Sequence, residues 1–212
     1  MMSERRPLVL RIVFALVALV ALVMATALVL TGCSDKDTAS APVAGLSAQR
    51  TMLSEGYSLL YTDASHIDLV DLVLYVKVES QEFNDVITEI SHYGGEQKKD
   101  LERIARDYPG VRIDLKPLPE METRKRFAIG KDRAIRFAPL VGHSRLEYER
   151  TMLISMSNAL NHESHLCQVM AAEEPDASLK EFLLASEKRY DGLYERVVNL
   201  LNREHFKYNV NS

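Results

Sequence analysis

Two stretches of apolar residues near the C-terminus most constrain how this chain can fold. From residue 144 onward, leucines, methionines and one cysteine follow a seven-residue repeat, at positions 146, 153, 156, 160, 167 and 170. After Pro175, a second apolar series with three- and four-residue steps runs from Leu179 to Leu201. This spacing puts the apolar side chains on one face of a helix. Each stretch therefore predicts an amphipathic helix that packs against other helices.

Two capping-box patterns predict where helices begin. Ser178 with Glu181 marks the start of the last helix, and Ser65 with Asp68 marks the start of a long one. A glycine pair at 94 and 95 is expected to end the long helix and to turn the chain back on itself. Two shorter helices are predicted at residues 46–61 and 96–108.

The segment between the two halves is predicted to cross over the bundle. Residues 111–119 carry two prolines and are expected to be extended, and residues 120–139 are expected to be partly helical. The predicted fold is all-α: an antiparallel bundle of four to five helices, made of two hairpins joined by a long crossover. In helix order and crossover, residues 65–203 resemble ferritin-like four-helix bundles and uncharacterised helical domains of bacterial envelopes.

The N-terminus carries an export signal. Arg5, Arg6 and Arg11 precede an uncharged apolar run over residues 12–30. A positive segment followed by an apolar one is typical of a secretory signal, but this run is also about long enough to span a bilayer. The length of the run alone leaves a membrane anchor open.

The end of the run, Leu30-Thr31-Gly32-Cys33, resembles the lipobox of bacterial lipoproteins. The resemblance implies cleavage before Cys33, a diacylglycerol on its thiol and a further acyl chain such as palmitate on its new amino group. Residues 1–32 are then a signal peptide, residues 33–45 a lipidated flexible tether of small and polar residues, and residues 46–212 the helical domain. An uncleaved anchor with a chance cysteine is the alternative.

The predicted location is the outer membrane, facing the periplasm. Several acyl chains hold a protein firmly on a bilayer. In proteobacterial lipoproteins, an aspartate directly after the lipidated cysteine retains the protein in the inner membrane, and here that place holds Ser34. A source that sorts its lipoproteins differently would leave the protein in the inner membrane.

Charge and cysteine content exclude some classes of function. The net charge is −4, and removal of residues 1–32 takes away three basic residues and one acidic residue. A chain this acidic gives no reason to expect nucleic-acid binding. With Cys33 lipidated, Cys167 is the remaining cysteine, so no intramolecular disulfide is expected. A lone cysteine of this kind is most often a small buried hydrophobe.

Glu163 is the residue that fits its surroundings least. It lies on the apolar stripe between Leu160 and Cys167, where a carboxylate must be paired, protonated or bound to a cation. The interpretation we favour is a pair with an arginine or a tyrosine hydroxyl. The alternative is a ferritin-like metal or redox site, which would use Glu163 with four other side chains: His162, His165, Glu79 and Glu82.

A basic stretch occupies the predicted crossover. Its cations are Arg124, Lys125, Arg126, Lys131, Arg133 and Arg136, with phenylalanines and isoleucines interleaved. Such a stretch could contact an acidic partner or anionic lipid head groups. The alternative is a solvated segment whose arginines pair with carboxylates elsewhere in the chain.

No pattern of catalytic residues is present. The sequence has no Gly-x-Ser-x-Gly elbow, phosphate-binding loop, dinucleotide fingerprint or paired-cysteine metal motif. We therefore expect a lipid-anchored binding or accessory module of the cell envelope, without enzymatic activity and with an envelope protein as partner. No cofactor is expected beyond the covalent lipid on Cys33. The alternative function is metal binding or redox chemistry centred on Glu163.

Overall fold

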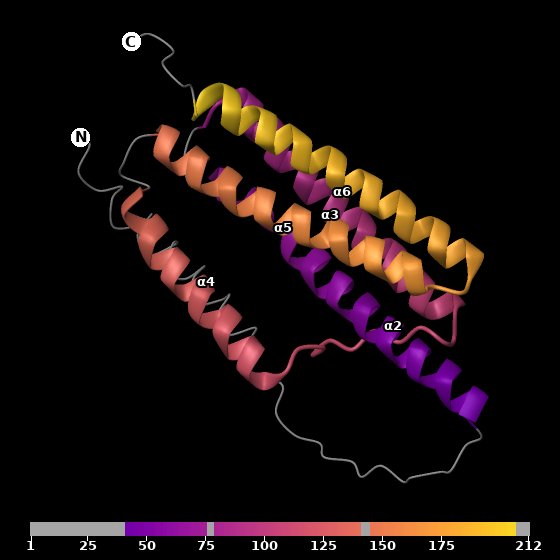
Figure 1. The fold of residues 1–212 in the computed structure, drawn as a ribbon. Helices are drawn as coiled ribbons and strands as arrows, with labels where there is room; N and C mark the ends of the chain where they lie inside the picture. The colour runs from indigo at the N-terminus through magenta and orange to yellow at the C-terminus, as the bar shows by residue number, and fades with distance from the viewer. Residues whose placement is uncertain (1–40, 76–78, 141–144, 207–212) are drawn as a thin grey trace, which may run out of the picture. The chain divides into compact units, whose positions relative to one another are not determined.

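The computed structural model describes residues 41–75, 79–140 and 145–206 (Figure 1). The predicted signal peptide, Cys33 and the first part of the tether lie outside these residues. The described part contains five α-helices and no strand, which confirms the all-α prediction. The helices belong to one compact unit, residues 40–212. Their bounds are α2 Ala41–Ile67, α3 Gln81–Asp107, α4 Glu120–Leu140, α5 Arg145–Glu173 and α6 Ala177–Glu204, with a 3₁₀ helix at Val70–Tyr75.

Two antiparallel hairpins form the bundle. α5 and α6 pack along their lengths, and α2 packs on α3 (Figure 1). The hairpins meet where α2 contacts α5 and where α3 contacts α6. The apolar repeat of α5 and the apolar series of α6 share one core, in which the rings of Tyr93 and Tyr190 meet edge to face with centroids 5.0 Å apart. Burying each large side chain of this kind stabilises the fold by roughly 1.5–3 kcal/mol.

The first hairpin is built differently from the sequence prediction. α2 already begins at Ala41, within the expected tether, and runs through Gly56 and Ser65 to Ile67. The capping box predicted at Ser65 is wrong, because the Ser65 hydroxyl lies inside the helix and donates to the carbonyl of Tyr61 at 2.7 Å. The real start of α3 is capped by Ser80, whose side chain accepts from the backbone N–H of Phe83.

The glycine pair at 94 and 95 does not end a helix, so the predicted turn there is also wrong. α3 continues through both residues to Asp107. A β-carbon on Gly94 would lie 2.6 Å from the backbone nitrogen of Asp68, and the hydroxyl of Ser91 donates to the Asp68 carbonyl. Gly94 therefore lets the end of α2 approach the backbone of α3. The first hairpin consists of α2 and α3, rather than of residues 65–94 and 96–108.

The second hairpin matches the prediction except at one cap. α5 ends at Glu173, just before Pro175, as the sequence indicates. The N-cap of α6 is Asp176 rather than Ser178, because the Asp176 carboxylate accepts from the backbone N–H groups of Ser178 and Leu179. An N-cap of this type is worth about 1 kcal/mol.

The crossover is extended and then helical. Residues 111–119 carry no helix, as predicted, and hydrogen bonds hold them to α2: the hydroxyl of Ser58 accepts from the N–H of Asp114 at 2.8 Å. α4 is a continuous helix rather than a partly helical segment. Along residues 120–132, all its side chains except that of Glu122 are exposed. None of the described helices combines the length and apolarity needed to cross a bilayer.

Candidate functional site

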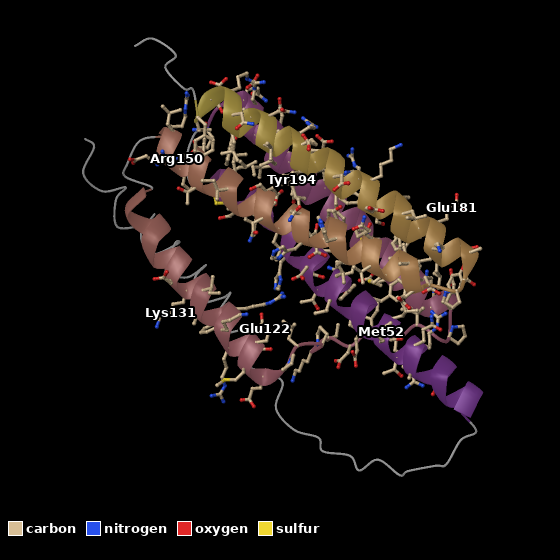
Figure 2. The ribbon with its side chains drawn as sticks, in the orientation of Figure 1. Met52, Glu122, Lys131, Arg150, Glu181 and Tyr194 are labelled. Atoms are coloured by element: carbon tan, nitrogen blue, oxygen red, sulfur yellow. The ribbon has the colours of Figure 1, made fainter. Side chains whose placement is uncertain are left out.

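The predicted basic stretch forms most of α4. Arg124 pairs with Glu120, and Lys125 pairs with Glu122, each within the same helix. Lys131 projects from α4 into solvent (Figure 2). Two further predicted residues, Arg133 and Arg136, belong to α4, but their side chains lie outside the described part of the chain.

The surface of α4 combines these cations with exposed apolar groups. Met121, Phe127 and Ile129 are all exposed. Exposed ion pairs within one helix are worth only a few tenths of a kcal/mol, so their cations can exchange partners at little cost. The described part of α4 therefore offers both charge and apolar area to a binding partner.

Arg126 differs from the other cations of α4 because it reaches the bundle. Its Nη1 lies 2.8 Å from Oδ1 of Asp63 on α2, and its Nε lies 3.3 Å from Oε1 of Glu122. The Asp63 side chain is 21% exposed. Asp63 also faces His66, whose Nδ1 is 3.9 Å from the same carboxylate oxygen.

Asp63 also interacts with Glu163, the carboxyl group that was predicted from the sequence to be buried. Glu163 is 4% exposed, which confirms its predicted burial, and it shares a hydrogen bond with Asp63. Burial and the negative charge of Asp63 raise the pKa of Glu163 well above its usual range. Burial also pushes the pKa of Asp63 upward, but the hydrogen bond from His66, the charge of Arg126 and the hydrogen bond with Glu163 lower it overall. The opposite directions of the two pKa shifts favour a pair that keeps a proton at neutral pH.

The other groups around Glu163 are neutral. Cys167 is fully buried, and burial together with the charge of Glu163 raises the pKa of its thiol. Its predicted role as a buried hydrophobe fits this environment. Burial and the nearby Glu163 also raise the pKa of Tyr190, whose hydroxyl has no hydrogen-bond partner among the described residues. One oxygen of Glu163, Oε2, lacks a hydrogen-bond partner in the same part of the chain.

The side chains proposed to form a metal site with Glu163 lie in separate places. His162 and His165 are exposed, and Nδ1 of His165 lies 2.9 Å from the carbonyl of Asn161. Glu82 pairs with Arg203. Over the described ranges, no three His, Cys, Asp or Glu side chains come together in a way that could hold a metal ion.

Glu79 lies at the far end of α5 from Glu163. It is buried, and its charge helps to raise the pKa of Tyr148, after the effect of burial. Tyr148 precedes Glu163 by 15 residues on α5, which corresponds to about 22 Å along the helix axis.

Asp63 was not among the site residues predicted from the sequence. Its position offered a signal, because Asp63 lies three residues after Leu60 and four before Ile67, and both are buried. An acidic residue at such a place on the apolar face of α2 must be paired, protonated or bound to a cation, as was argued for Glu163 on α5. The signal was hidden because α2 was predicted to end before this turn.

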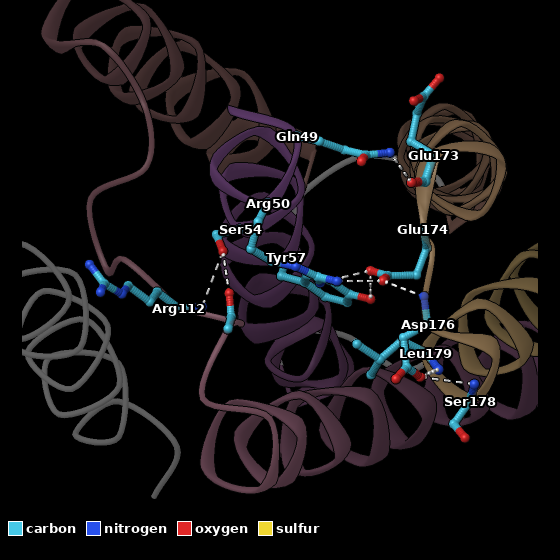
Figure 3. Close-up of polar contacts among 11 residues, drawn as sticks. Gln49, Arg50, Ser54, Tyr57, Arg112, Glu173, Glu174, Asp176, Ser178 and Leu179 are labelled. Atoms are coloured by element: carbon cyan, nitrogen blue, oxygen red, sulfur yellow. Dashed lines mark hydrogen bonds and ion pairs between the residues drawn. The ribbon is translucent and has the colours of Figure 1, made fainter. Parts of the chain in front are cut away.

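Another buried carboxylate, Glu174, joins the start of α2 to the α5–α6 turn (Figure 3). Its side chain is fully buried and accepts from Arg50 at 2.9 and 3.2 Å. It also accepts from the hydroxyl of Tyr57 at 3.0 Å and from the backbone N–H of Asp176 at 3.1 Å. Next to it, Gln49 donates to the carbonyl of Glu173 at 2.8 Å.

Another buried glutamate, Glu149, holds the opposite end of the bundle. It accepts from the backbone N–H of Ser80 at 2.7 Å and lies 3.5 Å from Nε of Arg145. His205, at the end of α6, is 3.8 Å away, and burial lowers the pKa of that imidazole. Glu149 and Glu174 thus fix the two ends of the hairpins, while Glu163 lies between them.

A shallow groove also runs between α5 and α6. Its volume is about 390 Å³, and it is lined by Ile154, Ser155, Ser157, Asn158, Asn161 and Tyr194. Amide and hydroxyl groups share this lining with apolar surface, and its residues include no carboxylate, histidine or cation. The lining therefore suits hydrogen bonding.

Comparison of the chain with protein-family models, with curated proteins and with solved structures finds no match.

Proposed function

We propose that this protein is a lipid-anchored binding module of the bacterial cell envelope and that it has no catalytic activity. The anchor is the lipidated Cys33 that the Leu30-Thr31-Gly32-Cys33 sequence implies. The lipid holds the chain on the outer membrane, facing the periplasm. The helical bundle then acts as a scaffold that carries α4.

The observation that carries the binding role is the exposure of α4. Helices of a bundle normally bury an apolar face, yet along residues 120–132 all the side chains of α4 except that of Glu122 are exposed. The helix displays Arg124, Lys125 and Lys131 together with apolar side chains. This composition favours a partner with an acidic surface and some apolar area.

The arrangement of the apolar groups favours a protein partner over a lipid surface. At about 100° per residue, Met121, Phe127 and Ile129 point in three different directions around the helix axis. A helix lying on a membrane needs its apolar groups on one side. A protein partner can contact several sides of α4 at once.

Photocrosslinking in intact cells tests this proposal. A photoreactive amino acid at Phe127 of the full-length protein should capture an envelope protein. The double variant Arg124→Glu, Lys125→Glu should lose that adduct, because it reverses charges that face solvent. Lys180→Glu with Lys188→Glu, which reverses two exposed cations on α6, is the matched control and should keep it. Adducts that are identical in both double variants, or adducts with lipid alone, would contradict the proposal.

The anchor is tested separately. Cys33→Ser should abolish incorporation of labelled palmitate and leave an unprocessed precursor. A variant that is still cleaved and labelled with palmitate would refute the lipobox assignment.

A further inference from the structure

Arg126 joins the exposed helix α4 to the helical bundle. It reaches Asp63, a carboxylate that is mostly withdrawn from solvent, while the neighbouring cations Arg124 and Lys125 pair within α4 itself. Arg126 therefore binds a site on the bundle, its dock, and it comes from a helix whose side chains along residues 120–132 are exposed, except that of Glu122. Such a contact can open without unfolding the core.

The dock is a pair of carboxyl groups rather than a single carboxylate. Asp63 shares a hydrogen bond with Glu163, and Oε2 of Glu163 has no hydrogen-bond partner in the described part of the chain. Two interacting carboxyl groups cannot both ionise without an electrostatic cost. The charge that the dock offers to Arg126 thus depends on how many protons the pair holds.

We propose that α4 is a detachable arm, that Arg126 docks it on the Asp63–Glu163 pair, and that loss of a proton from this pair tightens the docking. The proposal concerns the position of α4 and does not depend on the identity or existence of the partner proposed above.

Thermodynamic linkage between proton binding and docking sets the direction in which pH changes the docking of α4. The charge of Arg126 favours the ionised form of both Asp63 and Glu163. Docking and proton binding therefore oppose each other, and the coupling must be reciprocal. Docking tightens as pH rises through the range in which Glu163 ionises, and it weakens as pH falls.

The other titratable groups that face the pair do not reverse this direction. His66 faces the same carboxylate from α2, with its Nδ1 3.9 Å from Oδ1 of Asp63. Glu122 accompanies Arg126 on α4 and moves with it. Glu163 also helps to raise the pKa values of two buried neutral groups, Cys167 on α5 and Tyr190 on α6, after the effect of burial.

The absence of tryptophan from the chain allows a direct test. Phe127→Trp places a single fluorophore next to Arg126, at an exposed position where it disturbs no packing. Time-resolved fluorescence anisotropy of the full-length protein in detergent micelles then separates a docked α4, which turns with the bundle, from a released α4, which moves faster. Titration with NaCl gives a midpoint for release, because salt screens the contact.

Charge-neutral variants locate the contact. In the Phe127→Trp background, Arg126→Gln and Asp63→Asn should each weaken docking about fivefold, and the double variant should be no weaker than either single variant. Lys125→Gln removes a neighbouring charge without touching the bundle and should behave like the parent. Arg126 lies on the exposed part of α4, so its replacement should leave the core folded. Arg126→Gln therefore tests the contact even if Asp63→Asn does not fold.

A pH comparison tests the role of the proton. The parent should release α4 at a higher NaCl concentration at pH 9 than at pH 6, whereas Glu163→Gln should release it at the same concentration at both. If Arg126→Gln leaves the anisotropy of the parent unchanged, α4 is not held by this contact. If Glu163→Gln keeps the pH dependence of the parent, the carboxyl pair does not control docking.

Discussion

Glu174 and Glu163 are both buried glutamates that face α2, yet they are satisfied in opposite ways. Glu174 accepts hydrogen bonds from Arg50, Tyr57 and the backbone of Asp176, so its charge is neutralised within the bundle. Glu163 meets another carboxyl group and keeps one oxygen without a hydrogen bond in the described part of the chain. It depends on a proton and on a cation from α4.

The difference indicates that the contacts of Glu174 between helices are permanent, whereas those of the Asp63–Glu163 pair are adjustable. A buried carboxylate with several donors is costly to disturb, since removing one partner leaves an uncompensated charge. A carboxyl pair that shares a proton changes its charge with pH, and its cation can leave with α4. The four predictions below test this contrast from the largest expected effect to the smallest.

Removal of the Glu174 carboxylate should give the largest effect. Glu174→Ala leaves Arg50 and Tyr57 without their acceptor and should lower the free energy of unfolding by about 3–5 kcal/mol. Urea denaturation followed by circular dichroism measures it. Glu173→Ala, next to it but exposed, is the control and should change stability by less than about 0.5 kcal/mol. Similar losses of unfolding free energy in both variants would show that Glu174 does not hold α2 to the α5–α6 turn.

Replacement of Glu163 should change the pH dependence of stability. The folded state binds the Glu163 proton more tightly than the unfolded state, because its pKa is raised. The contribution of Glu163 to the free energy of unfolding is therefore complete below its pKa in the unfolded state. It falls as pH rises toward its pKa in the folded state, by at most about 1.4 kcal/mol per pH unit. Glu163→Gln should flatten this fall between pH 5 and pH 8 in urea titrations at several pH values. Equal slopes in the variant and the parent would contradict the shared proton.

Two tyrosine hydroxyl groups give a matched comparison of the joints. Tyr57→Phe removes a donor to the Glu174 carboxylate and should cost about 1.5–3 kcal/mol. Tyr190→Phe removes a hydroxyl that has no hydrogen-bond partner among the described residues, so thermal denaturation should show no loss or a small gain in stability. A larger loss at Tyr190 than at Tyr57 would reverse the assignment of the two regions.

Replacement of the two arginines should give the smallest difference in stability between the two regions, again with the larger loss at Glu174. Arg50→Gln removes the cation from the fully buried Glu174 and should cost about 1–3 kcal/mol. Arg126→Gln breaks a half-exposed pair and should cost less than about 1 kcal/mol. Chemical denaturation of both variants at the same salt concentration measures the difference. If Arg126→Gln is the more damaging, α4 is an integral part of the bundle.

The second hairpin could be predicted because its signals are local. An apolar repeat, a proline at the turn and polar residues around Asp176 set the ends of α5 and α6 almost to the residue. The first hairpin could not be predicted in the same way. Gly56, Gly94 and Ser65 look like local breaks or caps, but here helix packing determines their role. A β-carbon on Gly56 would lie 2.8 Å from the sulfur of Met170, so this glycine serves the approach of α2 to α5.

The candidate site shows the same division. The burial of Glu163 and the cationic character of α4 follow from the sequence alone, because helical periodicity places every residue of a helix relative to its own apolar face. The tertiary structure decided that Glu163 interacts with Asp63, that Arg126 pairs with Asp63, and that the other proposed metal ligands lie elsewhere. Those contacts depend on which helices become neighbours and how far each one extends. Spacing along a single helix carries no information about residues that meet across the core.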